Sequence, residues 1–189
     1  MTDHDEYFAY LQRRSAIGAL YRRHWLYPRL TRRLRGRCLD VGCGIGDMLT
    51  FRVGDTVGVD VNPRTVAYCR SRGAAAFTME PDRLPFAAGV FDSALLDNVL
   101  EHIAQPMPLL AEVRRVIKPG GQVLIGVPGR CGWASDPDHK VFYGEGELKA
   151  CVEPLGFHLR EVFHTPLWRS AWLDRNIRQY CVYGLFDRA

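Results

Sequence analysis

A glycine turn that directly follows a short apolar run constrains this chain most. The run Cys38–Val41 suits a buried parallel strand, and glycines stand at alternate positions from Gly42 to Gly46. Glycine lets the backbone turn sharply and approach a ligand with no Cβ in the way. A second apolar run, Val57–Val61, carries Asp60 near its end. Strand, glycine turn, helix, strand and acid in this order predict one half of a nucleotide-binding α/β unit.

The glycine spacing discriminates between cofactor classes. A dinucleotide fingerprint, G-x-G-x-x-G, would need glycine at position 47, where this chain has Asp47. The sequence instead reads G-x-G-x-G, with Asp40 two residues ahead of the first glycine. This spacing argues against the alternative of a NAD(P)-linked oxidoreductase, which would use the same half of the fold.

Further motifs follow the glycine turn in a fixed order. They are Leu84-Pro85-Phe86, the apolar run Phe91–Leu96, Glu101-His102, and Lys118-Pro119-Gly120-Gly121 leading into the apolar segment Gln122–Val127. Together with the glycine turn they resemble the class I S-adenosylmethionine (SAM)-dependent methyltransferases, in their small-molecule branch. The resemblance covers residues 37–128 closely and 144–163 more loosely. It implies a methyltransferase that uses SAM as its cofactor.

Strand and helix patterns alternate along the chain, which predicts a mainly parallel sheet with helices on both faces. Strands are expected at Cys38–Val41, Val57–Val61, Ala75–Met79, Phe91–Leu96, Gln122–Val127, Gly156–His164 and Gln179–Asp187. Helices are expected at Glu6–Leu34 with a break at Pro28, and at Asp47–Phe51, Pro63–Arg72, Met107–Ile117 and Gly146–Pro154. The expected fold is therefore α/β and Rossmann-like, a mainly parallel seven-stranded sheet with an antiparallel last strand, as the resemblance implies.

The length of 189 residues fits a single domain. Within it we expect a helical lid at 1–36, a cofactor-binding core at 37–128, and an acceptor-side region at 129–189. No apolar run approaches the ~20 residues that span a bilayer, and the acidic start does not read as a signal peptide. Six cysteines without metal-binding spacing favour reduced thiols and a cytoplasmic location.

The resemblance assigns cofactor contacts to the glycine turn and to the ends of the strands. Gly42, Cys43 and Gly44 would face the methionine part of SAM, and Asp40 would help place its ammonium group. Asp60 would hold the ribose hydroxyls, with Val61 beside the adenine. The structural alternative for Asp60 is an acid that caps the next helix.

Contacts at the adenine end are harder to assign. The family usually has an acid four residues before the Leu-Pro-Phe phrase, which here is Glu80, and the next residue normally donates a backbone N–H. That residue is Pro81, which has no N–H. We expect Glu80 with Met79 to border the adenine, with Asp82 as the alternative acid. Asp97 would hold the SAM amine through its backbone carbonyl.

Two histidines are candidate general bases for an oxygen nucleophile, which must lose its proton. His139 lies in the loop after the fifth strand, and His102 follows Glu101 after the fourth. A solvated loop histidine and a packing histidine are the structural alternatives. The ubiquinone-type O-methyltransferases have an extra acid three residues before the Glu-His phrase and bind a divalent metal. Asn98 stands at that position, so we expect no metal.

Arginines in the N-terminal region bear on the acceptor. Nine arginines lie between Arg13 and Arg37, whereas the whole chain has three lysines. Arginine suits phosphate and carboxylate recognition, so we expect a small, hydroxylated, anionic acceptor such as a sugar or glycan precursor. A solvated helix face is the structural alternative. Net charge is only +4 without aromatic interleaving, and no nucleic-acid partner is expected.

Two tryptophans near the C-terminus stand one helical turn apart, at Trp168 and Trp172. Packing or self-association as a homodimer is the favoured interpretation. Capping of the acceptor pocket or contact with a membrane surface is the alternative. The favoured function is O-methylation, and the alternatives are a C-methyltransferase of quinone or lipid type and a non-catalytic SAM-binding module.

Overall fold

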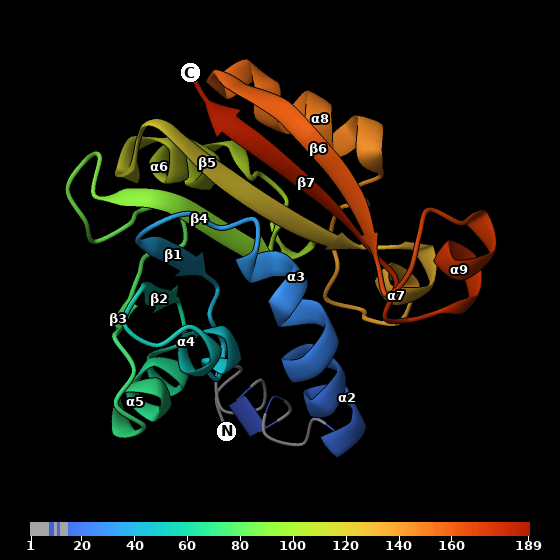
Figure 1. The fold of residues 1–189 in the computed structure, drawn as a ribbon, viewed down its shortest axis with the longest axis horizontal. Helices are drawn as coiled ribbons and strands as arrows, with labels where there is room; N and C mark the ends of the chain where they lie inside the picture. Colours follow the sequence, from blue (N-terminus) through green and yellow to red (C-terminus); the bar gives the residue numbers. More distant parts are fainter. Residues whose placement is uncertain (1–7, 10, 12–14) are drawn as a thin grey trace.

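The computed structural model describes residues 8, 9, 11 and 15–189, and its centre is one seven-stranded sheet (Figure 1). The strands lie in the order β3-β2-β1-β4-β5-β7-β6. Their bounds are β1 Cys38–Val41, β2 Thr56–Asp60, β3 Ala76–Thr78, β4 Phe91–Asp97, β5 Ile117–Pro128, β6 Phe157–Thr165 and β7 Cys181–Arg188. The first five strands pair in parallel, and β7 pairs antiparallel with both β5 and β6. The predicted fold class is confirmed.

Helices cover both faces of this sheet, as expected for strands joined by helical crossovers. They are α2 Ala16–Tyr21, η1 Arg22–Leu26, α3 Tyr27–Thr31, α4 Asp47–Phe51, α5 Pro63–Ser71, η2 Leu100–His102, α6 Met107–Val116, α7 Arg130–Ala134, α8 Glu145–Val152, η3 Glu153–Leu155 and α9 Ala171–Asn176. None of the helices in the described part of the chain is long and apolar enough to cross a bilayer.

Alternate residues of the strands pack into two separate hydrophobic cores, one on each face of the sheet. Leu39 and Val41 of β1 pack with the apolar side of α6 and α8, whereas Cys38 packs with α3 and α4 on the other face. This alternation follows from the two-residue period of a strand. Figure 1 shows the result, with the orange α8 and the green α6 on one side of the sheet and the blue run α2 to α3 on the other.

The N-terminal helix differs from its prediction around Pro28. The described part runs through α2, the π-turn η1 and α3 without a break, and Pro28, which has no N–H to donate, lies at the start of α3, just after the π-turn. Part of the predicted range, residues 6, 7, 10 and 12–14, lies outside the described residues. The sequence analysis also missed the short helices α7 and α9.

The two C-terminal tryptophans do not pack in the core. Trp168 precedes α9 and is 70% exposed, while Trp172, in the first turn of α9, is 65% exposed. Core packing was therefore the wrong expectation for this pair, and self-association through it stays a prediction.

Candidate active site

A cavity of about 520 Å³ opens at the carboxyl ends of β1 and β4. Ligands of parallel α/β sheets bind at this edge, where the strand order reverses. Three parts of the chain line the cavity: the glycine loop after β1, the lid helices α2 to α3, and segments that follow β4, β5 and β6. Asp40, Gly42, Cys43, Gly44, Asp97, His102 and His139, all predicted from sequence, are among the lining residues.

The glycine loop is shaped for close approach of a ligand. Gly42 has a φ of 72°, and a Cβ there would lie 2.7 Å from Cγ2 of Val99. Gly44 also has a positive φ, of 52°. The backbone N–H groups of Gly42 and Cys43 both donate to the Val59 carbonyl, which fixes the loop to β2. A side chain at Gly42 would be strained and crowded at once.

Two carboxylates reach the cavity from neighbouring strands. Asp40 lies almost fully buried near the end of β1, and burial raises the pKa of its carboxyl well above the usual range, with the charges of Asp97 and Asp60 adding to the effect. Asp97 accepts a hydrogen bond of 2.7 Å from the Tyr183 hydroxyl. Like charges held in a dry site favour a cationic ligand. SAM carries a sulfonium and an ammonium, so this pair fits the cofactor.

Asp60 accepts backbone hydrogen bonds on both of its carboxylate oxygens. Its Oδ2 accepts from the Gly44 N–H at 2.9 Å and its Oδ1 accepts from the Asn62 N–H at 2.8 Å. The carboxylate therefore ties the glycine loop to the end of β2, and Asn62, not Asp60, caps α5. Each oxygen keeps a second lone pair, and the ribose contact stays a prediction.

The other residues expected at the nucleoside end also lie outside the cavity lining. Val61 is exposed beside Asp60, and Met79 is buried, with its N–H donating to the Asp60 carbonyl. Glu80 is exposed, and its backbone forms an isolated antiparallel β-bridge with that of Arg83. Their assignment to the adenine therefore rests on the sequence pattern alone.

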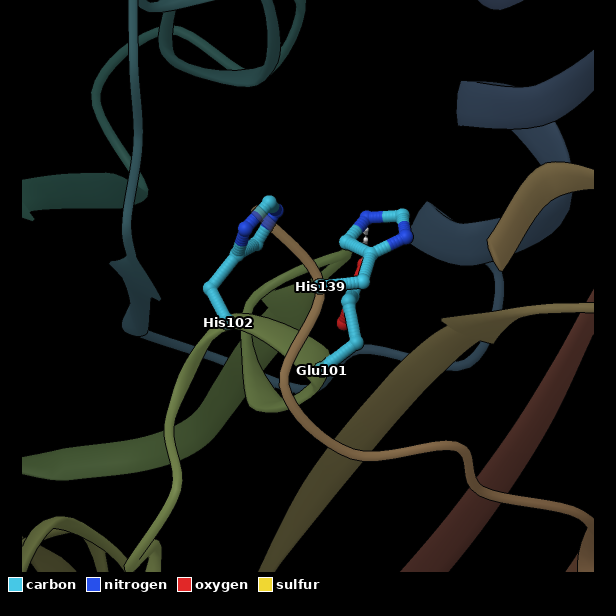
Figure 2. A group of neighbouring side chains, drawn as sticks. All are labelled: Glu101, His102 and His139. Atoms are coloured by element: carbon cyan, nitrogen blue, oxygen red, sulfur yellow. Dashed lines mark ion pairs between the residues drawn. The ribbon is translucent and has the colours of Figure 1, made fainter. Parts of the chain in front are cut away.

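Glu101, His102 and His139 form a compact cluster beside the cavity (Figure 2). The first two belong to η2, and His139 comes from the loop after α7. The backbone brings them together, because the N–H groups of Lys140 and Val141 both donate to the Glu101 carbonyl. The two imidazole rings meet edge to face, with centroids 4.6 Å apart. Both predicted histidines thus lie at one place.

Hydrogen bonding fixes the tautomer of His139. Its Nδ1 lies 2.8 Å from the Trp133 carbonyl oxygen, which can only accept, so Nδ1 carries the proton. The lone pair is then on Nε2, which lies 3.9 Å from Oε1 of Glu101. Burial lowers the pKa of His102, and the neighbouring His139 adds to this effect. A neutral imidazole with a free lone pair can take a proton from an acceptor.

Glu101 is fully buried, and neither of its carboxyl oxygens has a hydrogen-bond partner among the described residues. Burial raises its pKa to about 8. The sequence analysis treated Glu101 only as part of a common phrase, because nothing in the sequence shows that the loop after α7 closes over it.

The same cluster could hold a metal ion. One ligand atom from each of Glu101, His102 and His139 lies within 4.8 Å of the others. Imidazole and carboxylate suit zinc and related divalent ions. The expectation that no metal binds here, based on Asn98, stays a prediction.

Arginines reach the cavity from two sides. Arg22 lines it from η1, and its Nε lies 3.2 Å from Oδ2 of Asp47 in the first turn of α4. This pair ties the lid to the glycine loop. Arg178, before β7, also lines the cavity and is exposed, which places it at the opening.

Tyr183 is the lining residue whose role the sequence hid most completely. It lies fully buried on β7, directly opposite Gly126 of β5. A Cβ at Gly126 would collide with the Tyr183 ring, so the glycine makes room for the phenol to reach Asp97. A glycine inside a strand signals such a close approach, but only the strand register identifies the partner.

Comparisons with known proteins agree with this site. Residues 39–125 match the model of the methyltransferase domain family. A probable SAM-dependent methyltransferase of Mycolicibacterium smegmatis is 29% identical over 160 residues, 76% of this chain and 62% of that protein. A ubiquinone biosynthesis O-methyltransferase of Xanthomonas oryzae is 28% identical, over 72% of this chain and 60% of that protein. A tRNA (carboxymethyluridine(34)-5-O)-methyltransferase of Xenopus tropicalis is 33% identical over 53% of this chain but 16% of that protein.

The chain spans less than two thirds of the length of these relatives. A crystal structure of a SAM-dependent methyltransferase from Thermotoga maritima matches the whole of both chains, with a TM-score of 0.79 and 18% identity, and so supports the fold. The matched domain contains the glycine loop, Asp40 and Asp97, which together suit the two positive charges of SAM. Residues 39–125 therefore match the methyltransferase domain family, and the chain is similar to SAM-dependent methyltransferases, whose cofactor is SAM.

Proposed function

We propose that this protein transfers the methyl group of SAM to an oxygen of a small, hydroxylated, anionic acceptor. The observation that carries the proposal is the position of His139. Its Nδ1–H is held by the Trp133 carbonyl, and the ring lines the cavity on which Asp40 and Asp97 converge. A base beside the place where a cationic methyl donor fits is the arrangement that O-methylation needs.

The cofactor, when bound, supplies an electrophilic methyl group on a sulfonium that leaves as a neutral sulfide. The residues of this chain position the cofactor and the acceptor, and they remove the proton of the acceptor hydroxyl. Asp40 and Asp97 hold the positive end of the cofactor, and the glycine loop lets it lie against the backbone. His139 Nε2 accepts the hydroxyl proton as the new C–O bond forms. The buried Glu101 carboxyl lies beside this nitrogen, with Oε1 3.9 Å from Nε2, and in its ionised form it would stabilise the imidazolium.

An anionic acceptor is supported by the arginines at the opening. Arg178 lines the cavity without a carboxylate partner among the described residues. Arg22, in contrast, is already paired with Asp47. A guanidinium at the cavity opening can bind a phosphate or carboxylate bidentately. Arg178 would then bind the anionic end of the acceptor while the hydroxyl of the acceptor lies beside His139.

Two other functions are consistent with the family. A C-methyltransferase of quinone or lipid type would act on an apolar acceptor, which the polar lining around His102, Ser135 and Asp136 does not favour. A non-catalytic SAM-binding module would need the cofactor loop but no base. The fixed tautomer of His139 supports an enzyme over a module.

The first experiment tests cofactor binding by calorimetric titration with S-adenosylhomocysteine, with NAD as the negative control. We expect micromolar binding, and Asp40→Asn should weaken it by about 1.5–3 kcal/mol, the effect of one charged hydrogen bond. No binding to S-adenosylhomocysteine would refute the proposed activity.

The second experiment finds the acceptor. The protein is incubated with ¹³C-methyl SAM and pools of sugar phosphates, hydroxy acids, quinols or tRNA, with and without EDTA. We expect a methyl–oxygen signal from an anionic hydroxylated compound, insensitive to EDTA. A methyl–carbon signal from quinols would favour the C-methyltransferase, and tight cofactor binding without any product would favour the module.

A further inference from the structure

Large apolar side chains gather on one part of the surface next to the cavity. Six of the ten large hydrophobic residues that are exposed in the described part of the chain lie in two segments, the lid and the stretch between β6 and β7. We call them the apolar rim: Ile17, Leu20, Trp25, Leu167, Trp168 and Trp172. Ile17 is 81% exposed and Trp168 is 70% exposed. Exposed apolar side chains that gather in one part of a surface mark an interaction site.

The two segments touch each other. The indole N–H of Trp25 donates to the Pro166 carbonyl at 2.6 Å, although the residues are 141 positions apart. The Arg29 guanidinium lies over the Trp25 ring, 3.6 Å from its centroid. Because Leu167 and Trp168 directly follow Pro166, the contact joins the lid and the second segment into one surface.

This surface borders the opening of the cavity. Gly18 and Tyr21 line the cavity from the lid, and Thr165 and Arg178 line it from the two ends of the second segment. On the helical run that starts with α2, Ile17 and Leu20 lie three positions apart and both point to solvent, while Leu26 and Leu30 are buried against the sheet. The lid therefore packs one face against the sheet. Its other face is apolar at Ile17 and Leu20 and has no partner among the described residues.

The charges of the same segments are mostly positive. Residues 15–33 contain five arginines and no acid, and residues 166–179 contain three arginines and one acid, Asp174. Asp174 is paired with Arg130. Arg23, Arg32 and Arg175 are exposed. The surface thus offers aliphatic and indole side chains surrounded by guanidinium groups.

We propose that the apolar rim docks on an anionic lipid bilayer, so that the cavity opening faces the membrane surface. Tryptophan and leucine side chains insert at the level of the headgroups, and arginines beside them bind lipid phosphates. A second copy of this chain is a poorer partner, because a two-fold contact would set the same arginines against each other. RNA is also poorer, because Ile17, Leu20 and Leu167 gain from an apolar phase but cannot stack on bases.

Cosedimentation with vesicles tests the docking. The full chain is mixed with vesicles of phosphatidylcholine alone, or of phosphatidylcholine mixed with the anionic phosphatidylglycerol, at low and high salt. We expect binding to the mixed vesicles only, weakened by high salt and accompanied by a blue shift of tryptophan fluorescence. Size-exclusion chromatography and a tRNA titration at the same salt measure the other two partners.

Two double variants test the surface itself. Trp168→Ser with Trp172→Ser removes the most exposed indoles, and Val53→Ser with Met107→Ser removes two exposed apolar side chains elsewhere as its control. Arg23→Glu with Arg175→Glu reverses the charge of the rim, and Arg35→Glu with Arg83→Glu gives the same change in net charge away from it. Each rim variant should weaken vesicle binding by at least about tenfold, since the first loses apolar side chains that insert into the interface and the second loses basic residues, each of which contributes about 1 kcal/mol near an anionic surface. The controls should bind as the unmodified protein does.

The outcomes separate this proposal from the proposed function. S-adenosylhomocysteine titration shows whether each variant is folded, independently of lipid. Absence of vesicle binding, equal loss in rim and control variants, or binding to tRNA or a second copy in place of vesicles would each overturn the membrane docking. None of these outcomes would affect the assignment of His139, which the methylation assay tests.

Discussion

The cofactor side and the acceptor side of the cavity are built from the chain in opposite ways. The proposed cofactor side comes mainly from one stretch, residues 40–62, whose backbone is turned by glycines and bonded to itself through Asp60, with Asp97 added from β4. The proposed acceptor side is assembled from side chains far apart in sequence, among them His102 after β4, His139 after α7 and Arg178 before β7. The backbone thus prepares one side, and tertiary packing prepares the other.

This difference has a consequence for mutations. Changes on the cofactor side should act through the shape of the main chain, so even a small side chain there is harmful. Changes on the acceptor side should lower the rate of methyl transfer and leave the cofactor affinity unchanged. The following predictions test that separation.

His139→Ala should have the largest effect. Loss of the general base should lower kcat by about 100- to 10,000-fold, with the affinity for S-adenosylhomocysteine unchanged. Steady-state kinetics and calorimetry measure the two quantities. His158→Ala, at an exposed position of β6, is the matched control and should change neither kcat nor the affinity for S-adenosylhomocysteine. A loss of cofactor affinity in His139→Ala would contradict the separation of the two sides.

Gly42→Val should damage the cofactor side. Its positive φ of 72° and the Val99 side chain oppose any Cβ there, and backbone strain of about 1–3 kcal/mol corresponds to about 5- to 150-fold weaker binding of S-adenosylhomocysteine. The control is Gly73→Val, where φ is 78° but nothing lies within 4 Å of a Cβ. That variant should be less stable to heat yet bind normally. Equal binding losses in both would mean that strain alone, without the crowding, explains the effect.

Glu101→Gln should change how stability depends on pH. Burial raises the pKa of Glu101 to about 8, against about 4.3 in an unfolded chain. The folded state therefore binds the proton more tightly, and the stability from this group, complete below pH ~4.3, is lost progressively up to pH ~8. Glutamine mimics the protonated acid, so the variant should gain on the original protein by about 1–3 kcal/mol at high pH.

Chemical unfolding at several pH values measures this gain. Identical pH curves for the two proteins would show that Glu101 is ionised in the native state. A stabilising effect of added zinc or manganese on the original protein, absent in Glu101→Gln, would contradict the expected absence of a metal.

Arg22→Ala should have the smallest effect. The pair with Asp47 is partly exposed, with side-chain exposures of 21% and 32%, and such pairs contribute less than about 1 kcal/mol to stability. Because Arg22 ties the lid to the first turn of α4, the variant should also release S-adenosylhomocysteine faster. Lys149→Ala, which breaks the exposed pair with Glu153 far from the cavity, should change stability by a similar amount and leave release unchanged.

The sequence predicted the sheet and the cofactor loop because their signals are local. Apolar runs and a glycine turn, such as Cys38–Val41 with Gly42, need no knowledge of distant residues. For Asp60, the local pattern predicts the position but not the hydrogen bonds. The motif places it correctly at the end of β2, but its bonds to the Gly44 and Asn62 amides depend on how the loop folds back.

The acceptor side could be predicted only in part. Both histidines were identified, but their contact depends on the loop after α7 closing over the Glu101 carbonyl. The expectation for Trp168 and Trp172 used helical spacing, whereas the helix begins only at Ala171, so the first indole lies outside it. Short helices such as α9 are set by tertiary contacts that a local pattern does not record.

The close fit between Gly126 and Tyr183 also limits how this protein can evolve. Any residue larger than glycine at position 126 would occupy the space of the phenol ring, and a smaller residue at 183 would leave Asp97 without its hydroxyl donor. The order of change therefore matters, since the side chain at 183 must shorten before the one at 126 can grow. In the descendants of this chain, Gly126 is expected to persist for as long as the tyrosine does.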